Sequence, residues 1–323
     1  MRTALLAAAA ALALALPASA QEEPKGAPAP SEIVAAAPQA DWVAIPAEDL
    51  LVMTLAPDAE GKPRQVVIQL MPAPFSQGWV HNIRLFARAK WYDGISVNRV
   101  QDNYVTQWGD PNYDNPEATG KAKPLPEGLK VMGEAEYIST GIHRMIQKSG
   151  YSSDLISDPY SAYTFMFRGW PIATDDRVMG AWPTHCYGMV GVGRNYSPDT
   201  GSGAELYTVI GHAPRHLDRN IALVGRVIEG MQHLSSLPRG SGALGFYTAE
   251  ESAKRTPILT VRVASDLPAA EQPAFEYLST ESETFATYAE AVANRRDPFF
   301  IAPAGGADIC NIRVPVRRVA GAE

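Results

Sequence analysis

The chain has 323 residues, of which 46% are hydrophobic and 20% are charged, so it can form a core of domain size. Its formal net charge of -7 argues against a nucleic-acid partner, because nucleic-acid-binding proteins present a positive face to the phosphates. Length and composition therefore favour a globular protein with one large domain or two small ones.

Residues 1–20 are predicted to be a signal peptide rather than part of the fold. Arg2 supplies a positive start, residues 4–16 form an apolar run, and residues 18–20 (Ala-Ser-Ala) match a cleavage site of small residues. The run is short for a bilayer span, and no later segment is apolar enough to be one. Because the signal is alanine-rich and has no lipobox cysteine, we expect export to a bacterial periplasm and no membrane span.

Residues 21–40 are rich in Ala, Pro and Glu. Such a composition offers few side chains for a core and predicts a flexible, loosely extended leader. We therefore expect the folded part of the chain to begin at about residue 41.

The chain has two cysteines, Cys186 and Cys310. In an oxidising compartment an even pair can form a disulfide. Two buried free thiols that pack as small hydrophobic groups are the alternative. The spacing does not decide between them, because it gives no information on the geometry that a bond requires.

The segment after Trp42 has a pattern typical of β-structure, interrupted by one helix. Strands are predicted at residues 49–55, 64–70, 95–100 and 104–108. Residues 75–90 are predicted to be helical, because Trp79, Ile83 and Phe86 recur at helical spacing.

A similar order of elements returns later in the chain. Strands are predicted at residues 187–192, 206–210, 222–228 and 257–264. A short helix is predicted at residues 229–236. The order lacks the regular strand–helix alternation of a parallel sheet, so it indicates a mostly β protein with a few helices.

Two blocks of sequence are more specific than these patterns. The first covers about residues 65–111 and contains VVIQL, a helix and WYDGISVNRVQDNYVTQWGDP. The second covers about residues 188–237, contains GMVGVGR and GAELYTVIGHAPRHLDRNIALVGRVIEGMQHL, and is followed by a closing strand at 258–264. In this order the blocks resemble the two halves of a cyclophilin-type peptidyl-prolyl cis-trans isomerase, here a divergent, exported bacterial member. Residues 216–231 are the most specific part of the resemblance.

The resemblance implies a mainly β fold, a closed eight-stranded antiparallel barrel with two flanking helices, over residues 41–265. An insertion at about residues 112–185 lies outside it. There, Ile138, Ile142, Met145 and Ile146 could form the apolar stripe of a helix. We expect this helix to dock on the barrel; the alternative is a flap over the groove that selects clients.

Residues 266–323 also lie outside the resemblance and are expected to pack on the barrel as an extension. A helix is predicted at residues 281–296, because Ser282 or Thr280 could cap it and its charges complement the helix dipole. Residues 311–319 resemble a strand that contains Pro315, which favours an edge position.

The resemblance also implies an apolar groove for a proline ring, with an arginine at its rim. Arg99 stands at the catalytic position. The substrate-binding positions that it implies are Tyr104, Val105, Gln107, Gly193, Leu206 and His216. No metal and no cofactor is expected; His212 and His216 are four residues apart but lack the glutamate of a metalloprotease motif.

An arginine suits the chemistry of proline isomerisation. Rotation about an amide costs ~18–20 kcal/mol because it breaks resonance. A fixed donor aimed at the proline nitrogen or carbonyl favours the twisted amide over the planar one, without a nucleophile or proton transfer. The guanidinium is always charged and can hold more than one acceptor, so Arg99 can be this donor.

Several groove positions depart from the family pattern. Asn98 replaces the histidine before the arginine. Ala204 stands where the family has a glutamine, and Leu206 where it has a phenylalanine. Arg194 replaces an asparagine, and Ile221 replaces a second histidine.

Two functions therefore stay open. The first is a prolyl isomerase that assists the folding of exported proteins and acts on their proline-containing segments. The alternative is a catalytically weak cyclophilin-like module or chaperone that binds such segments without turnover. Retention of Arg99 and Gln107 favours the isomerase, and we expect a monomer.

Overall fold

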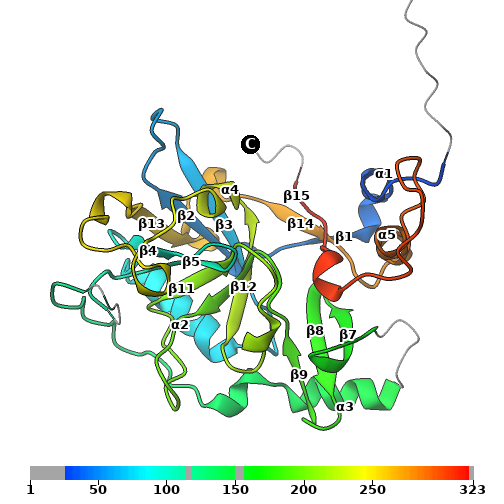
Figure 1. Ribbon diagram of the computed structural model, residues 1–323, viewed down its shortest axis with the longest axis horizontal. Helices are drawn as coiled ribbons and strands as arrows, with labels where there is room; N and C mark the ends of the chain where they lie inside the picture. Colours follow the sequence, from blue (N-terminus) through cyan, green and yellow to red (C-terminus); the bar gives the residue numbers. More distant parts are fainter. Residues whose placement is uncertain (1–25, 114–115, 117, 150–155, 320–323) are drawn as a thin grey trace, which may run out of the picture.

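The computed structural model describes residues 26–113, 116, 118–149 and 156–319 of the chain (Figure 1). The signal peptide predicted at residues 1–20 lies outside these residues. None of the helices that the structure describes has the length and hydrophobicity needed to cross a bilayer.

Eight antiparallel strands form the body of the molecule, in the order β13-β2-β3-β12-β10-β11-β5-β4. In chain order they are β2 (Leu50–Leu55), β3 (Arg64–Leu70), β4 (Ser96–Val100), β5 (Val105–Gly109), β10 (Met189–Val192), β11 (Leu206–Val209), β12 (Leu223–Glu229) and β13 (Ile258–Val263). Backbone hydrogen bonds join the two outer strands: Val97 N donates to Thr256 O at 2.9 Å, and Ile258 N to Ile95 O at 2.8 Å. The sheet is thereby almost closed on itself, which confirms the predicted mainly β, eight-stranded barrel.

Two helices flank the barrel, as predicted. Helix α2 (Gln77–Arg88) buries Trp79, Ile83 and Phe86 in the same core as the inward side chains of the strands. Helix α4 (Gln232–Ser235) adds Leu234. Burial of each such side chain contributes about 1.5–3 kcal/mol, so these apolar faces fix both helices on the barrel.

The insertion contains a second sheet that the sequence analysis missed. Its strands, in spatial order, are β6 (Ile156–Asp158), β7 (Ser161–Phe167), β8 (Trp170–Asp175) and β9 (Gly180–Pro183). Helix α3 (Thr140–Ser149) packs against β9 and buries Ile142 and Ile146, while Met145 is exposed. The predicted helix is present, but its partner is the insertion's own sheet at the foot of the molecule in Figure 1.

The two ends of the described chain meet in a third sheet. Its order is β1-β14-β15, and the strands are β1 (Trp42–Ala44), β14 (Phe275–Leu278) and β15 (Val316–Arg318). Helix α5 (Glu283–Ala293) begins at Ser282, whose Oγ accepts a hydrogen bond from Phe285 N at 3.1 Å. The cap predicted at Ser282 is therefore confirmed, and the predicted strand at 311–319 is shorter than expected.

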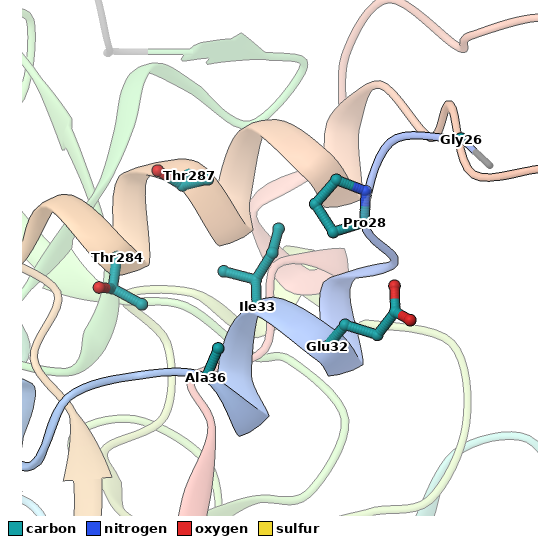
Figure 2. Close-up of a pocket in the computed structure, with 7 residues that line it drawn as sticks. All are labelled: Gly26, Pro28, Glu32, Ile33, Ala36, Thr284 and Thr287. Carbon is teal, nitrogen blue, oxygen red and sulfur yellow. The ribbon is translucent and has the colours of Figure 1, made fainter.

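The predicted leader differs from a loosely extended chain. Residues 30–35 form helix α1 (Pro30–Ala35), which packs against α5 with Ile33 and Val34 (Figure 1). A hollow of about 600 Å³ lies between the two helices. Figure 2 shows residues that line it, with Ile33 of α1 pointing toward the helix that carries Thr284 and Thr287. The flexible-leader prediction is therefore wrong for this helix, because its apolar side chains find partners on the C-terminal extension.

Cys186 and Cys310 form a disulfide, with their Cα atoms 5.0 Å apart. Of the two alternatives that the sequence left open, the structure has the bonded one. The bond joins the end of the insertion to the C-terminal extension, so parts of the chain 124 residues apart are cross-linked beside the barrel.

Candidate active site

A groove of about 480 Å³ lies on the outer face of the barrel, over β4, β5 and β11. The residues that line it are Arg99, Tyr104, Val105, Gln107, Pro116, Gly193, Arg194, Asn195, Tyr196, Glu205, Tyr207, Leu217, Ile221, Leu244 and Phe246. Five of the predicted site residues are in this set: Arg99, Tyr104, Val105, Gln107 and Gly193. The structure therefore brings together residues that are up to 94 positions apart (193 − 99) in the sequence.

Strand β11 corrects one of the predicted positions. Leu206 packs in the barrel core, whereas Tyr207 packs with Val105 and Val209 on the outer face. Neighbouring residues of a strand point to opposite sides, so a slip of one residue exchanges the faces. The prediction that Leu206 lines the groove is wrong, and Tyr207 is the side chain there.

The same slip affects the neighbouring position. Ala204, expected to replace a glutamine of the groove, is buried in the barrel core. Glu205 lines the groove instead, and its Oε2 accepts a hydrogen bond from Gln107 Nε2 at 2.5 Å. The groove thus has a polar side chain and an aromatic ring at the two positions where the sequence analysis expected Ala204 and Leu206.

Arg99 is held by three neutral acceptors. Its Nε donates to Leu244 O at 2.7 Å, its Nη1 donates to Gln107 Oε1 at 3.0 Å, and its Nη2 donates to Gln101 Oε1. The guanidinium also lies 5.5 Å from the centre of the Tyr104 ring and 5.5 Å from that of Phe246. These contacts fix its position without cancelling its charge.

Burial lowers the pKa of Arg99, and the nearby tyrosine and glutamate side chains partly oppose this shift. The group stays a cation at neutral pH, because an arginine pKa lies far above it. A guanidinium has five N–H donors, and the three acceptors above use three of them. Among the residues that the structure describes, no acceptor takes the other two donors, so they can serve a ligand in the groove.

A loop at residues 240–247 forms the outer wall beside Arg99. Gly240 N donates to Val100 O at 3.0 Å and Tyr247 N to Asn98 O at 2.9 Å, so the loop is attached to β4. The Glu251 carboxylate accepts hydrogen bonds from Ser241 N at 3.0 Å and Thr248 N at 3.2 Å. A hydrogen bond from Lys254, together with these backbone donors, lowers the pKa of Glu251 to about 2. Sequence reasoning missed this wall, including Leu244 and Phe246.

The floor of the groove is apolar. Val105 and Tyr207 are buried, and Tyr104 and Ile221 pack against them. A Cβ atom at Gly191 would lie 2.3 Å from the Tyr207 hydroxyl, so the glycine makes room for this ring. The floor can therefore accept a ring the size of proline and keep water away from the adjacent arginine.

Three further positions are placed outside or at the edge of this floor. Asn98 is buried in the barrel wall, where its Nδ2 donates to Gly109 O at 3.0 Å. His216 is exposed and does not line the groove, but its ring is stacked at 6.5 Å from that of Tyr104. A Cβ at Gly193 would lie 3.0 Å from Glu205 Cβ, so a side chain there would crowd the Glu205 end of the groove.

The described part of the chain contains no cluster of side chains suited to bind a metal ion. Among those residues, no group of three or more His, Cys, Asp or Glu side chains could hold a metal ion. The chemistry that this arrangement offers is hydrogen bonding from a fixed cation beside an apolar floor.

Comparison with known proteins identifies the family and the fold of the chain. Residues 64–263 match the family model described as cyclophilin type peptidyl-prolyl cis-trans isomerase/CLD. Among solved structures, the chain is similar to the cyclophilin AquaCyp293 from Hirschia baltica, with 20% identity, a TM-score of 0.63, and coverage of 87% of this chain and 95% of that one. A cyclophilin-type peptidyl-prolyl cis-trans isomerase from Cryptosporidium parvum also matches, with 10% identity, a TM-score of 0.38, and coverage of 65% and 97%. No curated protein sequence matches the chain.

Proposed function

The chain belongs to the family of cyclophilin-type peptidyl-prolyl cis-trans isomerases, and from this premise we propose that it accelerates X-Pro isomerisation in exported proteins through Arg99. The observation that carries the proposal is the fixed position of Arg99 beside an apolar floor, with two N–H donors that no acceptor in the described part of the chain takes. Proteins that arrive unfolded after export must select their proline isomers, and they supply the proline-containing segments.

Arg99 acts by favouring the twisted amide. In the planar amide the proline nitrogen shares its lone pair with the carbonyl, and twisting returns that pair to the nitrogen. A guanidinium held in place can donate to the nitrogen or to the proline carbonyl, and it interacts more strongly with the twisted state. Gln101, Gln107 and the Leu244 carbonyl are neutral acceptors, so none of these three hydrogen bonds neutralises the cation that makes this interaction.

The floor and the polar end of the groove hold the substrate. A proline ring fits against Val105 and Tyr207, and the polar side chains of Gln107 and Glu205 lie next to the guanidinium. An apolar surface beside Arg99 excludes water and so strengthens the hydrogen bond to the twisted amide. Binding and rotation are thus supported by two different parts of one groove.

The proposed site of action is the periplasm. Its support is the signal-peptide pattern at residues 1–20 and the Cys186–Cys310 bond, since disulfides persist in oxidising compartments. We expect the protein to act there as a monomer, which size-exclusion chromatography with light scattering would test.

The proposal is tested by NMR exchange on a short X-Pro peptide, without a coupling protease. The protein from Gln21 onward is compared with Arg99→Ala and with a control, Arg296→Ala, whose side chain makes an exposed ion pair on α5. We expect wild type and control to accelerate exchange equally, and Arg99→Ala to lose roughly 10²- to 10³-fold, as when a preorganised donor is removed elsewhere.

The alternative, a module that binds proline segments without turnover, predicts a different result. Wild type and Arg99→Ala would then both show peptide-induced shifts and no acceleration, and that outcome would overturn the isomerase. The presence of Tyr207 and Glu205 in the groove weakens the alternative, because two of the positions that depart from the family pattern, Ala204 and Leu206, lie in the barrel core.

A further inference from the structure

Behind the groove, a chain of buried polar side chains begins at the Tyr207 hydroxyl. This hydroxyl lies 2.9 Å from His185 Nε2, and His185 Nδ1 lies 2.9 Å from Asp218 Oδ1. Arg215 Nε donates to Asp218 Oδ2 at 2.6 Å, and its Nη1 donates to Asp158 Oδ2 at 2.6 Å. The chain thus runs from the groove, through the end of the insertion, to the turn between β6 and β7.

The donors in this chain can be assigned from their partners. A carboxylate only accepts hydrogen bonds, so His185 donates to Asp218 through Nδ1. In the neutral ring Nε2 is then an acceptor, and the Tyr207 hydroxyl donates to it. Tyr207 is 4% exposed and His185 is fully buried, so no water replaces this bond. The phenol has a single fixed orientation as long as the imidazole stays in place.

The imidazole is itself fixed from two sides. Asp218 Oδ1 accepts a second hydrogen bond, from the backbone N of His185 at 2.9 Å. The next residue, Cys186, is bonded to Cys310, whose Sγ lies 3.9 Å from His185 O. These contacts explain how a residue outside the barrel can determine the position of a ring in the groove.

We infer that His185 is a positioning residue of the isomerase groove: it fixes the Tyr207 ring and so sets the affinity for the proline-containing segment. The inference rests on the proposed function, because it takes Tyr207 as the part of the groove floor that contacts the peptide. The Tyr207 ring contacts the bound proline and not the twisting amide. A change in the position of this ring should therefore alter mainly KM and have little effect on kcat.

Two substitutions separate the two bonds of His185. The side-chain amide of an asparagine lies near the position of Nδ1. His185→Asn therefore keeps a donor for Asp218 but loses the hydrogen bond with the Tyr207 hydroxyl. The amide of a glutamine reaches the place of Nε2, so His185→Gln keeps a partner for Tyr207. We expect His185→Asn to raise KM and the peptide Kd about tenfold, the scale for one unsatisfied buried hydroxyl, and His185→Gln to raise them less than threefold.

A double variant and a matched control make the test specific. In a Tyr207→Phe background there is no hydroxyl to satisfy, so His185→Asn should change the peptide Kd less than twofold. The control is His143→Asn, since His143 is also fully buried and its Nδ1 meets Thr174 Oγ1 at 2.9 Å within the insertion. Equal effects of the two His→Asn changes, or an undiminished effect in Tyr207→Phe, would overturn the inference.

A measurement on the unaltered chain covers the case in which a variant fails to fold. The Tyr207 hydroxyl proton should exchange with water far more slowly than that of Tyr196, which lines the same groove and is 89% exposed. Equal exchange rates would overturn the inference. Neither the hydroxyl exchange rate nor the peptide Kd depends on turnover. A wild type without isomerase activity would therefore refute the proposed function, while these two measurements would still test whether His185 positions Tyr207.

Discussion

The Arg99 side of the groove and its floor at Tyr207 are stabilised in opposite ways. Arg99 is a half-buried cation on β4, held by neutral oxygens and aromatic rings that come partly from the loop at residues 240–247. Tyr207 is a neutral ring held by a buried cluster of His185, Asp218 and Arg215. The first arrangement keeps a charge available for the substrate, and the second uses charges where the substrate cannot reach them. Changes at the Arg99 wall should therefore alter turnover, and changes behind Tyr207 should alter stability and affinity.

The largest effect is expected from Arg215→Met. The substitution keeps much of the side-chain volume but leaves Asp158 and Asp218 buried without their cation, which typically costs about 3–5 kcal/mol of unfolding free energy. Chemical denaturation monitored by circular dichroism measures this loss. Arg296→Met is the control, since it removes an exposed pair with Glu290 and should cost no more than ~0.5 kcal/mol. Similar losses in both variants would show that the buried charges behind Tyr207 contribute no more to stability than an exposed ion pair.

A smaller loss is expected from Gly191→Ala. The new methyl group would lie 2.3 Å from the Tyr207 hydroxyl, so the ring must move away from His185. Overpacking of this kind costs about 1–3 kcal/mol. We expect a lower melting temperature and a weaker peptide affinity, measured by calorimetry and NMR titration. Wild-type affinity in this variant would show that the position of Tyr207 does not matter for binding.

On the Arg99 wall, Phe246→Ala should lower kcat/KM about threefold to tenfold. The ring is one of the two that flank the guanidinium, and a cation–π contact contributes roughly 0.5–1 kcal/mol at an exposed site and ~2 or more when desolvated. The NMR exchange assay measures the change. Phe246 is only 5% exposed, so the substitution also lowers the unfolding free energy, and kcat/KM is compared at a temperature where the variant is folded. Phe299→Ala, at a ring that is 85% exposed on the C-terminal extension, should leave kcat/KM unchanged.

The smallest effect concerns pH and the loop beside Arg99. The pKa of Glu251 is about 2 in the folded protein against an ordinary value of 4.5, so its stabilising contribution is complete above pH 4.5. That contribution declines as the pH falls from 4.5 towards 2, when the carboxylate that accepts from Ser241 N is protonated. The protection factors of the amides of residues 240–247, which correct for the intrinsic pH dependence of exchange, should therefore fall over this interval. In Glu251→Gln the same residues should show no such step; a step of unchanged size would assign it to another group.

Much of the barrel is predictable because its elements have local signals. The strands at 64–70 and 258–263 follow from runs of β-branched residues beside turn signals, and the helix begun by Ser282 follows from its cap. In β11 all four residues are buried, so alternation does not reveal which side faces the groove. The family resemblance points to Leu206, but Leu206 packs in the barrel core and Tyr207 on the outer face, a difference that exists only in the folded barrel.

The remaining parts of the site depend on contacts between distant segments. His185 meets Tyr207 and Asp218, 22 and 33 residues away, and Leu244 reaches Arg99 across 145 residues. The strand β8 is buried along its whole length and so lacks the alternating pattern that marks a half-exposed strand. Sequence reasoning could identify Arg99 and Gln107 through the family resemblance, but it could not identify residues whose role depends on these long-range contacts.

The Cys186–Cys310 bond also has a consequence for the order in which the groove is completed. Residue 186 leaves the ribosome 124 residues before residue 310, so the bond that anchors the peptide of His185 cannot form until nearly the whole chain has been made. It also needs an oxidising compartment. In a reducing compartment the chain therefore lacks the cross-link behind Tyr207, and the groove is complete only where the disulfide can form.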